Sequence, residues 1–176
     1  MYMELIDILT PQGKPTGRIK SKVDIHRDGD WHQAVHLWIR HSNGDWLMQL
    51  RSPRKINDPN RWDISVAGHV SSGEPLMQAL RREAEEELGI IPEIHEVKGL
   101  ATLREDRTLN QGQYLDREFH HIFFWEKDLD LSRLKLQTEE VAEVKWVSTS
   151  ELAKQVQRQD GSLVPHWEEY RLLLSL

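Results

Sequence analysis

The chain has 176 residues, no cysteine and a formal net charge of −6 at pH 7, with a pI near 5.8. This length predicts one domain over residues 1–176, and the missing cysteines exclude disulfides, thiolate metal sites and a thiol nucleophile. The acidic balance argues against nucleic-acid polymers as partners. No apolar run is long enough for a membrane span, and the N-terminus, which carries Glu4 and Asp7, lacks the features of a secretory signal. We therefore expect a cytoplasmic protein.

The first third of the chain predicts strands joined by short turns. Residues 4–20 form one expected hairpin, with turn residues at 11–15. Residues 33–51 form a second hairpin around Asn43-Gly44, a pair that suits the positive backbone angles of a tight turn. A further strand is expected at 61–67.

A helix is predicted between Pro75, expected at its first position, and Gly89, expected at its end. Its apolar stripe consists of Leu76, Ala79, Leu80, Ala84 and Leu88. Glu83 and Glu87 point into the same sector of the helix, and Glu86 lies beside them. This helix therefore directs carboxylates toward the side that should be buried.

Acidic residues crowd the last two turns of this helix, at Glu83, Glu85, Glu86 and Glu87. The helix dipole disfavours negative charge at this end, and like charges three or four residues apart repel. One interpretation is a solvated acidic face. The other is a site for a hard divalent ion, Mg²⁺ or Mn²⁺, which prefers clustered carboxylate oxygens and would bring substrate phosphates to the same place.

The second half of the chain predicts more strands and then helices. Strands are expected at 97–104, 113–126 and 143–147, a charged loop at 127–141, and helices at 148–158 and from about 165. The segment FHHIFFW is nearly continuous apolar sequence, as in a strand buried on both faces. Ser148 and Glu151 form a capping box for the first of these helices. The pattern favours the α/β class, with a mixed sheet between helical layers.

The spacing of the polar residues from 68 to 90 resembles the Nudix box. The matching residues are Gly68, Glu74, Arg82, Glu83, Ala84, Glu86, Glu87, Gly89 and Ile90. The resemblance implies a Nudix fold, which is an α/β/α sandwich, and a loop–helix–loop that binds divalent metal and cleaves a diphosphate linkage. It implies Glu83, Glu86 and Glu87 as metal ligands, Glu86 as the acid nearest the attacking water, and Arg82 as the residue that orients these glutamates.

Within the Nudix superfamily, the segments VDIHRDGDWHQAVHLWIR and WDISVAGHVSSGEP resemble the branch that contains isopentenyl-diphosphate isomerase. The isomerases have a catalytic cysteine where this chain has Ala67. They also have a metal site of histidines and an acid, and His69, Glu118, His32 and, with one residue fewer in the spacing, His26 fall at similar places. The alternative for the histidines is an ordinary hydrogen-bonded polar side chain, and the alternative for Glu118 is an ion pair with an arginine.

Substrate contacts are expected from basic residues close to the metal. Arg51, Arg54 and Lys55 are similar to the residues that hold diphosphate in the isomerase branch, although an ordinary basic loop is the alternative. Glu139 and Glu140 lie where many Nudix hydrolases have a further acid that serves as base or ligand.

We therefore expect a metal-dependent hydrolase that acts on a small-molecule diphosphate, with a homodimer as a possible assembly. The sequence leaves the organic group open among nucleoside diphosphates, thiamine diphosphate analogues and prenyl diphosphates. A Nudix-fold module that binds a nucleotide or cofactor without cleaving it is the alternative from another class. Isomerase activity is disfavoured because Ala67 has no proton to exchange.

Overall fold

The computed structural model describes residues 4–176. Its strands are β1 (Leu5–Leu9), β2 (Pro15–Ser21), β3 (His32–Arg40), β4 (Trp46–Arg51), β5 (Trp62–Asp63), β6 (Val66–His69), β7 (Val97–Leu109), β8 (Tyr114–Glu126) and β9 (Val141–Val147). Its α-helices are α1 (Lys22–Asp28), α2 (Leu76–Leu88), α3 (Thr149–Gln157) and α4 (Trp167–Leu173). Short 3₁₀ turns occur at Ile94–Glu96, Asn110–Gly112 and Leu131–Arg133.

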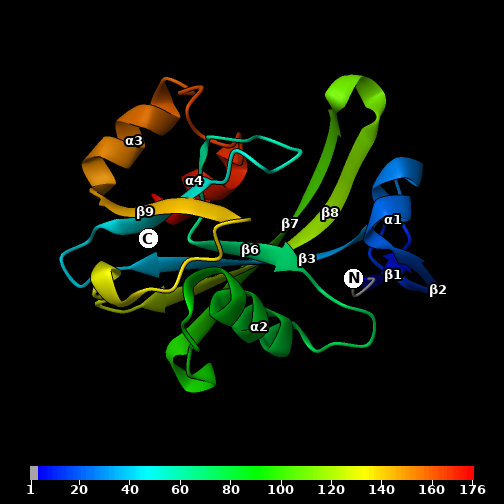
Figure 1. Ribbon diagram of the computed structural model, residues 1–176, viewed down its shortest axis with the longest axis horizontal. Coiled ribbons are helices and arrows are strands. Elements are labelled where there is room, and N and C mark those ends of the chain that lie inside the picture. The colour runs from blue at the N-terminus through cyan, green and yellow to red at the C-terminus, as the bar shows by residue number, and fades with distance from the viewer. Residues whose placement is uncertain (1–3) are drawn as a thin grey trace.

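The main sheet is mixed, and its strands follow the order β5-β4-β3-β8-β7, with β6 paired to β3 and β9 paired to β4. β3 runs parallel to β8 from His32↔Glu118 to Arg40↔Glu126, whereas the other strand pairs are antiparallel. Strands β1 and β2 form a separate ribbon beside α1, and the long β7–β8 hairpin projects from the body of the molecule (Figure 1).

β3 and β4 separate soon after the turn that joins them, with Arg40↔Trp46 as their paired residues. The segment 62–69 fills the gap, because β5 pairs with β4 and β6 pairs with β3. Ser65 lies between these two short strands, where its buried hydroxyl accepts a hydrogen bond from Ile39 N at 2.9 Å and donates one to Leu47 O at 2.6 Å. This hydroxyl satisfies backbone groups that the separating strands leave unpaired.

The expected continuous strand at 61–67 was therefore wrong, since the segment changes partner at Ser65. The expected pair of positive backbone angles in the 33–51 hairpin was also wrong in part. Gly44 has a φ of +95°, but Asn43 is not among the residues with positive φ. The first segment keeps its strand character on either side of Ser65. The loop between β3 and β4 spans residues 41–45, with Gly44 N donating to His41 O at 2.8 Å, so it is longer than the two-residue turn that needs two positive angles.

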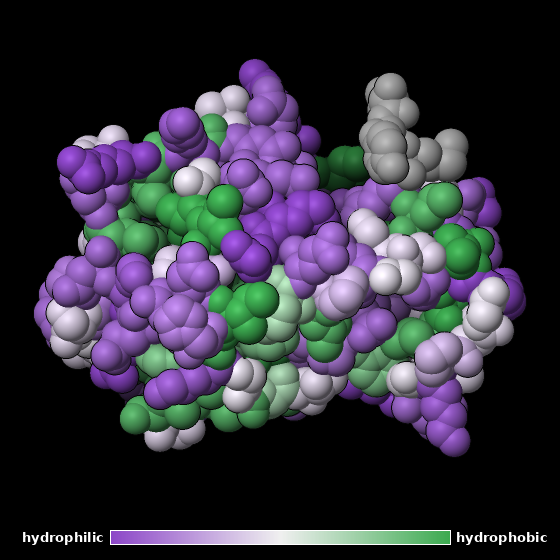
Figure 2. Space-filling view, turned by 90° about the horizontal axis from the view of Figure 1, so that it is seen from below, coloured by the Kyte–Doolittle hydropathy of each residue, from purple (hydrophilic) through white to green (hydrophobic). Residues whose placement is uncertain are grey.

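Helices cover both faces of the main sheet, with α2 on one side and α3 and α4 on the other (Figure 1). The core under α2 includes Val35, Leu37, Leu80 and Leu88, and the core under α3 and α4 includes Trp38, Trp46, Leu152 and Tyr170. This is the predicted mixed sheet between helical layers. The face seen from below in Figure 2 is mostly hydrophilic, with apolar side chains in scattered groups.

β8 lies in the middle of the sheet, between β3 and β7. Phe123 and Trp125 contribute to the core under α2, while Ile122 and Phe124 contribute to the core under the C-terminal helices. Alternate side chains of one strand therefore enter both layers, as a strand buried on both faces requires.

Helix α1 was not predicted. Ser21 caps its start by accepting a hydrogen bond from Asp24 N at 3.2 Å, and Gly29 ends it with a φ of +69°. Helix α2 begins one residue later than expected, because Pro75 takes the extended N-cap conformation, and it ends at Gly89 as predicted. Ser148 accepts from Glu151 N at the start of α3, as the capping box requires. Within residues 4–176, no helix is long and apolar enough to cross a membrane.

Candidate functional site

A cavity of about 1490 Å³ opens beside the gap between β3 and β4, and the structure brings nearly all of the predicted site residues to it. Its lining includes the predicted residues Arg51, Arg54, Lys55, His26, His69, Arg82, Glu83, Glu86, Glu87, Glu118, Glu139 and Glu140. His32 lies behind this wall and is fully buried.

The acidic end of α2 faces this cavity through Glu83, Glu86 and Glu87, which we call the box glutamates. Glu83 and Glu87 are buried, at 9% and 5% exposure, whereas the Glu86 side chain is half exposed. Burial of Leu80 and Leu88 stabilises the helix by roughly 1.5–3 kcal/mol each, which exceeds the roughly 0.2–0.5 kcal/mol cost of each like-charge pair. Core packing thus holds α2 in place despite its crowded acids.

Close approach of β6 to α2 fixes the two buried carboxylates. A Cβ at Gly68 would lie 1.9 Å from the carboxyl carbon of Glu83, so the glycine is what lets this carboxylate pack against the strand. The Oε2 atom of Glu87 accepts from Ala67 N and from Gln49 Nε2, each at 3.3 Å. The first glycine of the box therefore has a steric reason in this fold.

Arg82 joins several residues of the box in one hydrogen-bond network. Its Nε and Nη2 atoms donate to the two oxygens of Glu74 at 3.0 and 2.9 Å. Its Nη1 atom donates to Glu83 at 2.7 Å and approaches Glu86 at 3.4 Å, and Nη2 also donates to His69 O at 2.9 Å. The guanidinium thus orients two box glutamates and ties them to the strand beside them.

Burial raises the pKa of Glu83 to about 7 and the pKa of Glu87 to about 8. Arg82 opposes the shift at Glu83, and the charge of Glu83 adds to the shift at Glu87. Desolvation is the larger cause, so repulsion between neighbouring acids is a smaller contribution than the sequence suggested. These carboxyl groups hold protons near neutral pH. A divalent cation fits this set of oxygen donors, because it would displace the protons and be coordinated by the carboxylate oxygens.

A second group of ligand-type side chains meets one wall of the cavity. His26, His32, His69 and Glu118, which we call the histidine cluster, each offer one atom within 4.8 Å of the others. Glu118 Oε1 lies 3.0 Å from His32 Nε2 and 3.0 Å from His69 Nε2, and the Nε2 atoms of His26 and His69 lie 3.2 Å apart. Nitrogen and oxygen donors that converge in this way suit a divalent metal ion.

Within the histidine cluster the pKa values shift in different directions, and only those of His26 and His69 favour a neutral imidazole. Burial lowers the pKa of His26 and of His69 to about 3. Burial is the largest single influence on His32 and acts against its charge, but the hydrogen bond and the negative charge of Glu118, together with the Asp30 carbonyl and Asp116, outweigh it and raise the pKa of His32. Burial opposes ionisation of Glu118, yet its hydrogen bonds to His120, His32 and His69 hold its pKa well below the usual range. The pairing of Glu118 is thus with histidines and not with an arginine.

The predicted diphosphate-binding cations are engaged with protein acids. Arg51 Nη1 donates to Asp63 at 2.9 Å, and its other nitrogens donate to Asn57 O. Lys55 forms an ion pair with Glu140, and the exposed Arg54 pairs with Glu139 at 3.1 Å. All three line the cavity, so their role in substrate binding stays a prediction, although Arg51 has few donors to spare.

Several polar residues of the cavity were missed by the sequence analysis. Asp63 and His36 lie on its wall in strands that the hydrophobic pattern marks as ordinary core, and Asp116 faces it from β8, where burial raises its pKa to about 7. His166, just before α4, also reaches the cavity. The one sequence feature that could have identified these residues is a polar side chain at a strand position expected to be buried. The strand pattern alone does not show which cavity such a side chain faces.

Comparison with known proteins agrees with this geometry. The NUDIX domain family matches residues 30–167. Nudix hydrolase 3 of Arabidopsis thaliana is 38% identical over 94% of this chain, which spans only 22% of that protein, and an uncharacterized Nudix hydrolase of Clostridium acetobutylicum is 33% identical over 88% of this chain and 74% of its own length. An isopentenyl-diphosphate Delta-isomerase of Streptomyces avermitilis is 27% identical over 85% of this chain and 74% of its own length.

The fold is similar to that of a Deinococcus radiodurans protein, whose crystal structure gives a TM-score of 0.74 with 23% identity, over 96% of this chain and 98% of that one. The match over residues 30–167, with the box on a loop, helix and loop, identifies the domain as one of the Nudix type. The chain belongs to the NUDIX domain family, and its relatives include proteins named as Nudix hydrolases and as isomerases.

Gly68→Ala is expected to weaken metal binding by at least about tenfold, because the new methyl group displaces the Glu83 carboxylate. Stability should change little, since the end of a flexible side chain can move. Calorimetric titration with Mn²⁺ and thermal unfolding would measure both. Gly99→Ala is the matched control, because Gly99 is also in a strand and its new Cβ would meet only ordinary contacts. Binding by Gly68→Ala within about twofold of wild type would contradict the role of this glycine.

Glu87→Gln is expected to stabilise the chelator-treated protein at pH 8.5 and not at pH 5. The folded pKa of Glu87, about 8, lies above its ordinary value of 4.5, so the folded chain binds more protons and loses stability as pH rises between these values. Glutamine removes that loss, which should raise Tm by at least about 2–4 °C. Glu85→Gln, on the exposed side of the same helix, is the control. Equal shifts at both pH values would refute the buried-carboxyl explanation.

Proposed function

We propose that this protein is a metal-dependent hydrolase that cleaves a diphosphate linkage in a small molecule. The observation that carries the proposal is the convergence of the box glutamates, Arg82 and the basic residues Arg51 and Lys55 on one large cavity. Every ligand position of the Nudix box is an acid in this chain. A module that only binds nucleotides has no need to keep all three buried or half-buried carboxylates together.

Glu83, Glu86 and Glu87 are the residues that would hold Mg²⁺ or Mn²⁺. When bound, such ions neutralise charge on the phosphates and lower the pKa of attacking water. Glu86 is the most exposed of the three and lies at the open side, where it is placed to accept a proton from water. Arg82 keeps Glu83 and Glu86 oriented through the contacts that also bind Glu74.

The histidine cluster lies at the wall of the same cavity and is proposed as a further divalent-metal site, because its four ligand-type side chains converge. The isomerase activity itself is not proposed. Ala67 lines the cavity opposite His36 in the β3–β6 register, where an alanine cannot exchange a proton.

Glu86→Gln should lower turnover of the best substrate by at least about a hundredfold while the fold survives, because a neutral amide is a poor ligand for a hard cation and a poor base. Release of phosphate products from a panel of nucleoside, thiamine-type and prenyl diphosphates, with Mg²⁺ and with Mn²⁺, is the measurement. Glu85→Gln serves as the control on the same helix. Turnover within about threefold of wild type would remove Glu86 from the reaction.

The purified protein with Mg²⁺ should form no dimethylallyl diphosphate from isopentenyl diphosphate above background. Allylic isomerisation needs two proton-exchanging groups across the substrate, and the chain has no cysteine to supply one of them. Product analysis by mass spectrometry after chromatographic separation checks this directly. Clear conversion by the wild-type chain would show that another pair of residues performs the proton transfer.

A further inference from the structure

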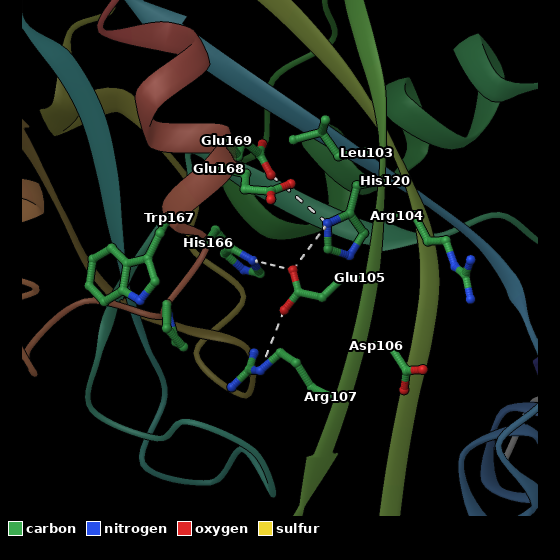
Figure 3. A pocket seen from close by; sticks show the side chains of 11 residues that line it. Leu103, Arg104, Glu105, Asp106, Arg107, His120, His166, Trp167, Glu168 and Glu169 are labelled. Carbon is green, nitrogen blue, oxygen red and sulfur yellow. Dashed lines mark hydrogen bonds and ion pairs between the residues drawn. The ribbon is translucent and has the colours of Figure 1, made fainter.

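A smaller cavity of about 300 Å³ lies between the β7–β8 hairpin and the start of α4, and it shares Arg107 and His166 with the lining of the large cavity. Figure 3 shows its polar end, where Glu105 of β7 points toward His120 of β8 and toward His166. We call Glu105, His120 and His166 the second cluster. They come from three elements far apart in the sequence and converge on one point.

The spacing of the second cluster suits a metal ion. Glu105 Oε2 lies 3.0 Å from His166 Nδ1 and 3.5 Å from His120 Nδ1, and the three ligand atoms lie within 4.8 Å of one another. Ligand atoms around a tetrahedral Zn²⁺, bound at about 2.0–2.1 Å, are about 3.3 Å apart. A further carboxylate, Glu169, has Oε2 3.9 Å from His120 Nδ1.

On the far side of the second cluster a carboxylate holds the His120 ring by a hydrogen bond, as a metal site requires, whereas the far nitrogen of His166 only approaches a carboxylate. His120 Nε2 lies 2.8 Å from Glu118 Oε2, and His166 Nε2 lies 3.5 Å from Asp63 Oδ1. A histidine that donates one ring N–H to a carboxylate presents the lone pair of its other nitrogen to a metal. Without a cation, that lone pair of His120 would face the carboxylates of Glu105 and Glu169. Glu105 Oε1 is buried without a hydrogen-bond partner, and Arg107 Nε is 3.4 Å away.

We propose that Glu105, His120 and His166 form a binding site for a borderline divalent ion of the Zn²⁺ type, distinct from the box glutamates and from the histidine cluster. Two nitrogens and one oxygen favour such an ion over Mg²⁺, which prefers oxygen ligands. The small cavity leaves room for water at the remaining position. Because His166 directly precedes α4, the ion ties the C-terminal helix to the hairpin.

The test uses Co²⁺ as a spectroscopic probe on the full-length chain in excess Mg²⁺, which occupies oxygen-only sites. A His26→Gln/His69→Gln background disables the histidine cluster without touching the second cluster. This background should bind about one Co²⁺ per chain with the intense visible bands of a four-coordinate site. Adding His166→Gln should abolish these bands, and the rise in Tm produced by Zn²⁺ should disappear with them.

His121→Gln is the matched control, because His121 follows His120 on β8 but is bonded to Gln33 and Thr102 outside the cluster. It should leave Co²⁺ binding unchanged. If His166→Gln fails to fold by circular dichroism, Glu105→Gln replaces it, with at least about tenfold weaker binding expected. Absence of the bands from the background variant, or their survival in the folded His166→Gln or Glu105→Gln variant, would overturn the proposal.

Discussion

The burial of Glu83 and Glu87 is the constraint on which the site depends. Each carboxylate is desolvated by packing of α2 against β6, and each would be costly in charged form without a partner. Gly68 leaves the space, the Ala67 N–H supplies a donor, and Arg82 supplies the nearest positive charge. Apolar burial of Leu80 and Leu88 maintains this arrangement. In charged form these carboxylates would be in an unfavourable electrostatic state that a divalent cation would relieve, and the surrounding residues keep them from rotating away.

The separation of β3 from β4 determines where Glu83 and Glu87 meet the large cavity. If these strands had paired along their whole length, β5 and β6 could not insert, and Ala67 and Gly68 would not reach the acidic end of α2. Ser65 reduces the hydrogen-bond cost of this separation, because its hydroxyl accepts from Ile39 N and donates to Leu47 O. A small buried polar residue in a short apolar segment thus controls the position of the cavity.

The sequence predicted the box and its helix because their residues are close along the chain, where helical periodicity and fixed spacing place them on one face. It predicted the histidine cluster only through resemblance, and the spacing of His26 counted against it. The structure explains why the spacing was a poor guide. His26 lies on helix α1, where its ring stacks on Tyr114 and lies close to His69, so the helix and not the number of residues before His32 determines its position. The second cluster had no local signal at all. Glu105, His120 and His166 meet only after β7 and β8 pair and α4 packs against them, so strand register and helix docking had to be known first.

Charge inside the large cavity links the metal sites to the proposed reaction. Its described lining contains ten carboxyl groups and seven lysine and arginine side chains, but burial raises the pKa of Glu83 and Asp116 to about 7 and that of Glu87 to about 8, so the walls become clearly acidic only as the pH rises through this range. Arg51 is already bound to Asp63 and Lys55 to Glu140, which leaves little free positive charge for a diphosphate. Once these carboxyl groups are ionised, Coulomb repulsion would oppose the entry of an anionic substrate, and divalent ions bound to them would reverse the sign of the potential. The carboxylates that line the cavity would therefore gather the ions that a small diphosphate needs, and in the proposed reaction the charge that attracts this substrate would come from the metal and not from the chain.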